Sequence, residues 1–209
     1  MTARRRTPPG RVSRLRLRHS LDIAVRGADL LERKLRILRD HHRKLVEQEH
    51  DAERTWRERL GEAETWLLRG LLLSGERALT TAAVAGRADI AVEWTVSMGV
   101  RHPSAPSCTD AVRADHEPAP ANTALLRAEA TYREAVRAAA ALAAARTAAG
   151  LMAAETERTG RRLRALRRHW IPRLSAELTA SDQALEQAEH EDAVRRRWAA
   201  AQNRHRSAR

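Results

Sequence analysis

The chain has 209 residues, of which only 3% are aromatic, with five Trp, one Tyr and no Phe. So few large side chains leave little to fill a deep globular core, whereas abundant Ala, Leu, Arg and Glu are typical of long helices and coiled coils. Cys108 is the only cysteine, which excludes an intramolecular disulfide and a Cys-cluster metal site and fits a reducing compartment.

The chain is strongly basic, with a net charge of +12 and an isoelectric point near 11.4. A charge of this size suits a polyanionic partner. Only Lys34 and Lys44 are lysines, however, and such a strong preference for arginine is also what GC-rich codon usage produces. The charge alone does not decide between these two explanations.

Residues 1–14 form a basic segment that we predict to be disordered. Because no apolar segment follows it, we expect no secretory signal. The longest apolar run, from Trp66 to Leu73, is interrupted by Arg69 and is too short to span a bilayer. We therefore expect a soluble protein with no direct membrane span.

Residues 15–75 are predicted to form one long helix. Apolar residues recur at alternating steps of four and three, which is the heptad pattern of a coiled-coil seam, and His42 and Glu49 are polar breaks in it. The predicted seam residues are Leu17, Leu21, Ala24, Ala28, Leu31, Leu35, Leu38, Leu45, Ala52 and Trp56.

Residues 76–120 differ from both flanking regions. Apolar and other residues alternate from Ala88 to Val100, which predicts a strand with one apolar face. Prolines then make residues 102–120 a predicted loop, although Cys108 to Val112 could supply a second short strand. This small central region therefore contains a short strand or hairpin and a Pro-rich loop.

Residues 121–202 are predicted to form a second long helix, followed by a basic tail at 203–209. Its first half is rich in Ala, which favours helix. The seam steps from Leu163 to Leu174 make an eleven-residue unit that locally unwinds a left-handed supercoil, and Pro172 inside it predicts a bend. The predicted seam residues are Leu163, Leu166, Trp170, Leu174, Leu178, Ser181, Leu185 and Ala188.

Two long helices joined by a small central region must run antiparallel to pack on each other. The predicted fold is therefore mainly α, a long antiparallel two-helix coiled coil. Charge suggests a register in which Glu47 to Glu53 lie near Arg161 to Arg167 and Asp182 to Glu189 lie near Arg26 to Arg36. The same register would gather Arg4 to Arg18 and Arg195 to Arg209 into one basic tip.

No catalytic constellation is evident in the sequence. No G-x-x-x-x-G-K-[ST] loop occurs, so we expect neither a nucleotide site nor another cofactor. His41, His42, Glu49 and His50 lack a metal-binding spacing, and no motif activates Cys108 or a serine. Tryptophans beside arginines could stack on nucleic acid, but Trp56 and Trp170 fall on the predicted seams; Trp198 is harder to assign to packing.

Three motifs in order resemble the D subunit of V/A-type rotary ATPases. The N-terminal motif contains Pro9-Gly10-Arg11, Leu15, Ala24, Gly27, Leu30-Leu31 and Lys34. The central motif contains Val96, Met98-Gly99-Val100 and Pro103. The C-terminal motif contains Arg161-Arg162, Ala165-Leu166, Ile171-Pro172-Arg173-Leu174, Leu185-Glu186, Glu189, Glu191-Asp192 and Arg195. Departures from the family pattern lie at Gly10, Glu32, Leu35-Arg36 and Ala193-Val194.

The resemblance implies a non-catalytic central-stalk protein that couples ATP hydrolysis or synthesis to proton or sodium ion transport. Its partners would be the A and B subunits of the catalytic ring, the F subunit and the C (d-type) socket of the membrane rotor. It would be cytoplasmic and peripheral on the inner face of the cell membrane. The termini would insert in the catalytic ring, and the central strand and Leu67 to Leu73 would lie at the far end.

Two alternatives belong to other functional classes. The charge of +12 also suits a basic coiled-coil protein that binds nucleic acid, with an affinity that falls steeply as salt rises. A helical scaffold with no role in energy coupling would show the same heptads. The sequence leaves the transported ion and the direction of ATP turnover open.

Overall fold

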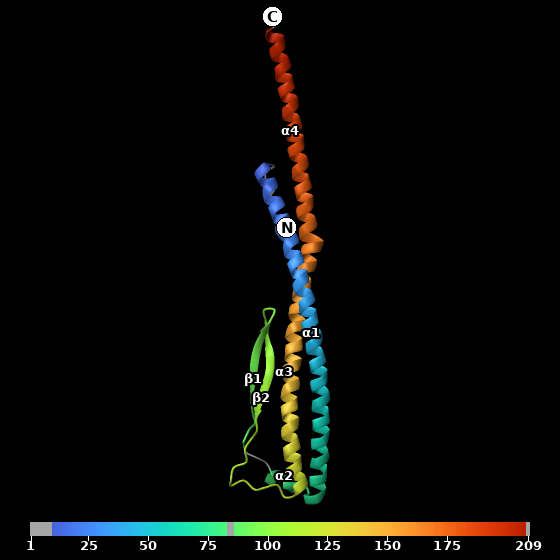
Figure 1. The fold of residues 1–209 in the computed structure, drawn as a ribbon, viewed down its shortest axis with the longest axis vertical. Coiled ribbons are helices and arrows are strands. Elements are labelled where there is room, and N and C mark those ends of the chain that lie inside the picture. Colours follow the sequence, from blue (N-terminus) through green and yellow to red (C-terminus); the bar gives the residue numbers. More distant parts are fainter. Residues whose placement is uncertain (1–9, 83–85, 208–209) are drawn as a thin grey trace. The chain divides into compact units, whose positions relative to one another are not determined.

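Helix dominates the computed structural model, which describes residues 10–82 and 86–207 (Figure 1). About 79% of it is helical, and the predicted fold class is confirmed, because the long helix α1 packs with α3 and α4 and a small two-stranded hairpin lies between α1 and α3 in the chain. The elements in chain order are α1 (Arg11–Ser74), α2 (Arg77–Ala82), β1 (Asp89–Ser97), β2 (Val100–Thr109), α3 (Thr123–Ala165), the π-helical turn η1 (Leu166–Trp170) and α4 (Ile171–Ser207).

Helix α1 extends beyond the predicted seam at both ends. It starts at Arg11 rather than at residue 15, while residues 1–9 of the predicted basic segment lie outside the described part. The heptad pattern also continues after Trp56, so the residues on the inward face of α1 are apolar or small as far as its last residue, Ser74. The further buried and half-buried positions are Leu60, Ala63, Leu67, Gly70 and Ser74.

The chain divides into two compact units, and helices pair antiparallel within each. One unit contains α1 up to Arg33 together with the chain from Thr159 onward, and the other contains residues 34–158. In the first unit the ion pairs between the helices include Arg11–Glu189, Arg14–Asp182 and Glu32–Arg167. In the second unit they are Lys34–Glu155, Glu49–Arg146, Arg59–Glu134 and Glu62–Arg127.

Asn122 joins the start of α3 to the end of α1. Its Oδ1 accepts a hydrogen bond from the backbone N–H of Leu125 at 2.8 Å, which is the geometry of a helix N-cap. Its Nδ2 donates to the carbonyl oxygen of Gly70 at 3.0 Å and lies 2.6 Å from the Oγ of Ser74. We call the region from Gly70 to Ser74 and from Asn122 to Leu125 the closed end.

Gly70 lets the two helices approach closely at the closed end. A Cβ atom at this position would lie 2.6 Å from Cδ2 of Leu125 and 3.1 Å from its backbone nitrogen, which is too close for any other residue without a shift. Leu125 is only 4% exposed. Together with Asn122, this contact sets which residues of α1 and α3 face each other.

The register predicted from charge is wrong. Glu49 pairs with Arg146 rather than with Arg161 to Arg167, and Asp182 pairs with Arg14 rather than with Arg26 to Arg36. Both shifts amount to about two to three heptads. Exposed ion pairs contribute only about 0.2–1 kcal/mol each, so they adjust to a register that the closed end imposes.

The central region forms a β-hairpin, and the prediction of a loop over 102–120 is wrong for its first part. Strand β2 runs antiparallel to β1 as far as Thr109 and contains Pro103 and Pro106. Proline is tolerated there because an edge strand leaves half of its N–H groups without a partner in the sheet. Met98 and Gly99, with φ of 54° and 82°, form the connecting turn, since the turns that favour hairpins need positive φ at both positions.

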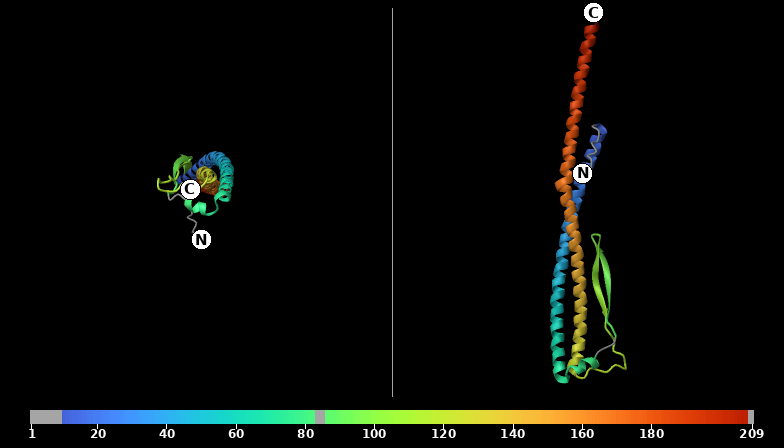
Figure 2. Two further views of the ribbon diagram at one scale, coloured as in Figure 1. Left: turned by 90° about the horizontal axis from the view of Figure 1, so that it is seen from below. Right: turned by 180° about the vertical axis from the view of Figure 1, so that it is seen from behind.

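The hairpin runs along α3 on the side away from α1, as all the views in Figures 1 and 2 show. This placement lies within the unit of residues 34–158. Nearly all of β1 is exposed, and buried side chains in the hairpin are confined to His102 and Pro103. The hairpin therefore adds little to the core of its unit.

We expect Gly70→Ala to destabilise the unit of residues 34–158 by about 1–3 kcal/mol, because the new methyl group collides with Leu125. The matched control is Gly61→Ala in the same helix, where a Cβ meets no atom within 4 Å. That change should stabilise α1 by about 0.5–1 kcal/mol. Urea unfolding followed by circular dichroism measures both; equal effects of the two changes would contradict the close approach.

Candidate partner-binding surfaces

The predicted seam residues of α1 all face inward to some degree. Ala28, Leu35 and Leu38 are buried, with exposed fractions of 1%, 6% and 0%. The others are half-buried: Leu17, Leu21, Ala24, Leu31, Leu45, Ala52 and Trp56. The polar breaks His42 and Glu49 are also half-buried, and Glu49 reaches out to Arg146 at 2.9 Å.

The second seam changes phase at η1. Leu163 and Leu174 are buried, whereas Trp170, the predicted seam residue between them, is 53% exposed. The half-buried Ile171 follows Leu166 in the inward row, a step of five residues instead of four. Beyond it the inward row continues at heptad steps through Leu174, Leu178, Ser181 and Leu185.

The π-turn accounts for the step of five. The backbone N–H of Ile171 bonds to the carbonyl of Leu166, five residues back, so the turn holds one residue more than an α-helical turn. Pro172 follows at once, and its ring would collide with the carbonyl four residues before it in a regular α-helix. The wider turn relieves that collision. The irregularity thus lies at Leu166–Trp170, directly ahead of Pro172, where the sequence predicts a bend.

Deleting His169 in a Pro172→Ala background should be tolerated. The deletion removes the extra residue, so Leu166, Ile171 and Leu174 fall on heptad steps in a continuous α-helix. Deleting Ala176 in the same background should cost roughly 1–3 kcal/mol, because it turns Leu178 and Leu185 out of the seam. Thermal unfolding compares the two with Pro172→Ala alone; an equal loss of stability from both deletions would contradict this account.

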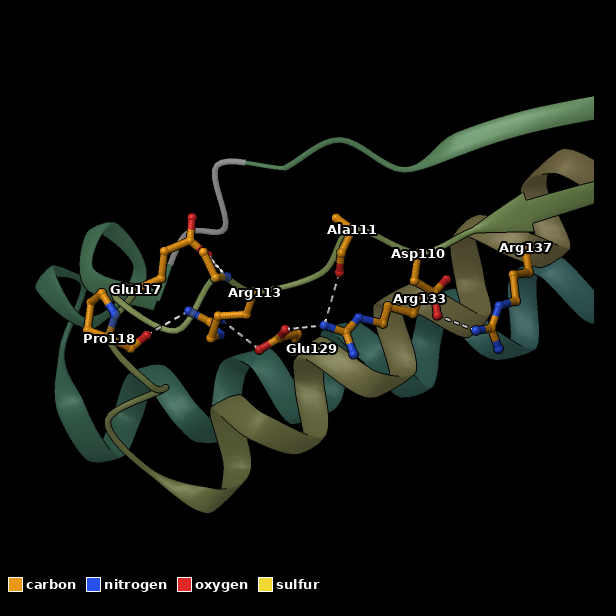
Figure 3. Close-up of polar contacts among 9 residues, drawn as sticks. Asp110, Ala111, Arg113, Glu117, Pro118, Glu129, Arg133 and Arg137 are labelled. Atoms are coloured by element: carbon orange, nitrogen blue, oxygen red, sulfur yellow. Dashed lines mark hydrogen bonds and ion pairs between the residues drawn. The ribbon is translucent and has the colours of Figure 1, made fainter.

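Glu129 of α3 anchors the loop that follows β2 (Figure 3). It accepts from the guanidinium of Arg113 at 2.9 Å and from that of Arg133 at 2.5 Å. Arg113 and Glu129 are mostly buried, with side chains 18% and 21% exposed, so solvent screens their ion pair little. Arg113 also donates to the carbonyl of Pro118 at 2.6 Å. We call Arg113, Glu129 and Arg133 the Glu129 clamp.

A second ion pair extends this attachment toward the hairpin. Arg137 of α3 pairs with Asp110, the residue directly after β2, and the guanidinium of Arg133 lies 3.5 Å from the carbonyl of Ala111 (Figure 3). Glu117 accepts from the backbone N–H of Ala114 at 3.0 Å, which closes a turn in the same loop. The base of the hairpin is thus fastened to α3 by charged groups.

Glu129→Gln should loosen the loop, because two guanidinium groups lose the charge they share. Hydrogen bonds to charged groups contribute about 1.5–3 kcal/mol, so trypsin should cut after Arg113 roughly ten times faster or more. The control is Glu134→Gln in the same helix, whose ion pair with Arg59 is about half exposed and contributes little. Unchanged cleavage after Arg113 in the Glu129 variant would show that other contacts hold the loop.

The closed end carries exposed apolar side chains beside an open cleft of about 740 Å³. Leu72 and Leu73 are 87% and 72% exposed. The guanidinium of Arg69 stacks over Trp66 at 4.7 Å from the ring centroid. The cleft is lined by Trp66, Arg69, Leu72, Leu73, Thr123, Ala124 and Arg127. Such a surface offers apolar area and guanidinium groups to a partner.

The described part of α4 beyond Glu189 has no buried residue. Side chains 190–204 are all exposed, and Trp198 is 67% exposed. Because Arg11 already pairs with Glu189, the described start of α1 lies beside the chain before Arg195. The described start of α1 therefore lies beside Glu189 and not beside Arg195 to Arg209, as the predicted basic tip required. Residues 1–9 and 208–209 of that predicted tip lie outside the described part.

A family model for the D subunit of ATP synthase matches residues 13–201, nearly the whole chain. The chain belongs to the ATP synthase D-subunit family. It is therefore a component of a rotary ATPase and a member of a complex with other proteins. The match includes both long helices and the hairpin between them, in agreement with the three motifs in the sequence. No curated protein matches the chain.

The described residues hold no group of three or more His, Cys, Asp or Glu side chains placed for a metal ion. The helical stretch Thr123–Arg204 is the one helix in the described part of the chain that is long and apolar enough to cross a membrane, and 33% of its most apolar 18-residue window is buried. A packed helix of a soluble protein meets the same criterion, so the window is weak evidence for a span.

Sequence reasoning missed three residues that organise the D subunit. Asn122 directly precedes an apolar helical run, and an N-cap residue in that place is a readable signal. The inward position of Ile171 could not be predicted from the heptad pattern, because it depends on the π-turn. Glu129 carries no local signal, since its partner Arg113 comes from a loop 16 residues away.

Proposed function

We propose that this D subunit is the non-catalytic central stalk of a V/A-type rotary ATPase, coupling ATP turnover to ion transport. The observation that carries the proposal is the antiparallel helix pair of each unit, in a chain whose family model matches residues 13–201. Each pair packs through a heptad seam and is crossed by ion pairs. Two mutually packed helices resist twisting better than one, which a shaft that carries torque requires.

The proposed partners follow the resemblance. The A and B subunits would surround the helical end that carries the chain termini, the F subunit would bind the side of the shaft, and the C (d-type) subunit would form the socket. The protein would then be cytoplasmic and peripheral on the inner face of the cell membrane. Transport of either protons or sodium ions is compatible with this role, because the ion would bind in a membrane protein of the complex.

The closed end is the surface that we assign to the socket. Leu72 and Leu73 present large apolar side chains to solvent, which a binding site explains better than a solvated surface does. The stacked pair of Trp66 and Arg69 adds a planar, charged neighbour, and Trp and Arg are enriched in the residues that dominate interfaces.

Co-purification tests the proposal. A tagged chain should recover A, B, F and C subunits, and a chain that recovers none of them would contradict the central-stalk role. The variant Leu72→Glu/Leu73→Glu should keep A, B and F but lose C. Because both side chains are highly exposed, its own stability should change by about 0.5 kcal/mol or less per site. Leu30→Glu, 64% exposed in the other unit, is the control and should retain C.

A further inference from the structure

Strand β1 has a free edge. In the described part of the chain the sheet has two strands, so each strand has a hydrogen-bonding edge that its partner does not use. The register shows which residues of β1 point their backbone groups outward. Ser97 pairs with Val100 across a two-residue turn, and the residues flanking such a turn bond to each other. By alternation, Trp94 and Val96 direct their N–H and C=O groups away from β2.

The other half of β1 follows the same rule. The Oγ of Ser107 lies 3.5 Å from the carbonyl oxygen of Ala91, which therefore faces β2. Its neighbours Ile90 and Val92 then face outward. At the irregularity between Val92 and Trp94 the extra residue lies on β2, so the alternation along β1 continues through it. Four residues thus offer backbone donors and acceptors along one edge.

The outer edge of β2 is different, because two prolines interrupt it. Pro103 pairs with Trp94 and Pro106 pairs with Val92, so both occupy outward-facing positions and supply no N–H there. Proline is one of the devices by which proteins block pairing at a sheet edge. Strand β1 contains no proline, and its edge is open.

The outward-facing residues of β1 also share one face, and that face is apolar and exposed. Exposed fractions are 47% for Ile90, 40% for Val92, 49% for Trp94 and 66% for Val96. The guanidinium of Arg101 lies over Trp94, 5.1 Å from the ring centroid. Among the described residues no carboxylate pairs with Arg101. A strand added to this edge would cover apolar area and find an unpaired positive charge.

We propose that the edge of β1 accepts an extended strand from another protein of the complex. The added strand would bond to the backbone of Ile90, Val92, Trp94 and Val96, as in other cases of strand addition. Its inward side chains would be apolar at alternate positions, with a carboxylate near Arg101. A second copy of this chain is disfavoured, because it would bring the same Arg101 and a further net charge of +12.

Hydrogen exchange of single amides tests the proposal, in the isolated chain and in the purified complex. In the isolated chain the outward amides of β1 should exchange quickly and the inward amide of Ala91 slowly. Assembly should slow the outward amides of Val92, Trp94 and Val96 by roughly tenfold or more. Equal exchange rates of the outward amides in the isolated chain and in the complex would overturn the proposal. If the outward amides slow in the isolated chain as its concentration rises, the edge binds a second copy of this chain, which would also overturn it.

Two proline variants give matched controls. Val92→Pro removes an outward N–H from the open edge, whereas Cys108→Pro adds a proline to the edge that already has two. Only the first should abolish the slowing of Trp94 and Val96 on assembly; slowing retained in Val92→Pro would overturn the proposal. If Val92→Pro speeds exchange at Ala91, the hairpin itself has changed, and Arg101→Glu, which leaves the edge intact, is used instead. It should weaken the slowing at least severalfold, and no effect would overturn the role of charge.

The proposal rests on the proposed function only for the existence of the complex, and the two fail separately. A chain that recovers none of the A, B, F and C subunits would contradict the central-stalk role. A chain that recovers all four while the outward amides of β1 still exchange quickly would contradict strand addition alone.

Discussion

The contact between Gly70 and Leu125 at the closed end is the constraint on which the helical pairing depends. Without a side chain at Gly70 the backbone of α3 lies against α1, and Asn122 hydrogen-bonds to both helices at the same place. Once one pair of residues is matched in an antiparallel pair, heptad repeats match the rest. Many weak ion pairs such as Glu49–Arg146 then form where this register brings opposite charges together, and they do not determine the register.

The π-turn keeps the pairing continuous where the sequence loses its phase. One extra residue between Leu166 and Ile171 would rotate every later apolar residue by about 100° in a regular α-helix. The wide turn absorbs that residue, and the same turn accommodates Pro172. A helix pair with an unbroken seam suits the torque-carrying role proposed for this protein, and Trp170 is left exposed as a consequence.

The hairpin shows how charged contacts can position an element without burying it. The Glu129 clamp and the Arg137–Asp110 pair fasten its base to α3, yet the strands contribute almost nothing to the core. A two-stranded hairpin is marginal by itself in water, so a persistent exposed one needs either this kind of anchoring or a partner. In a component of a larger complex, the open edge of β1 and the exposed leucines of the closed end are two surfaces available to partners.

The sequence by itself determined the two long helices, the seam of α1 and strand β1, because each depends on a local period of polar and apolar residues. Its terminal and central motifs also pointed to the family. Tertiary structure decided the register, the inward place of Ile171 and the second strand through Pro103 and Pro106. The register depends on one close contact between residues 55 positions apart, Gly70 and Leu125, and the inward place of Ile171 on a π-turn that a heptad count does not anticipate. A proline in a strand is acceptable only once the strand is known to lie at an edge, which no local pattern reveals.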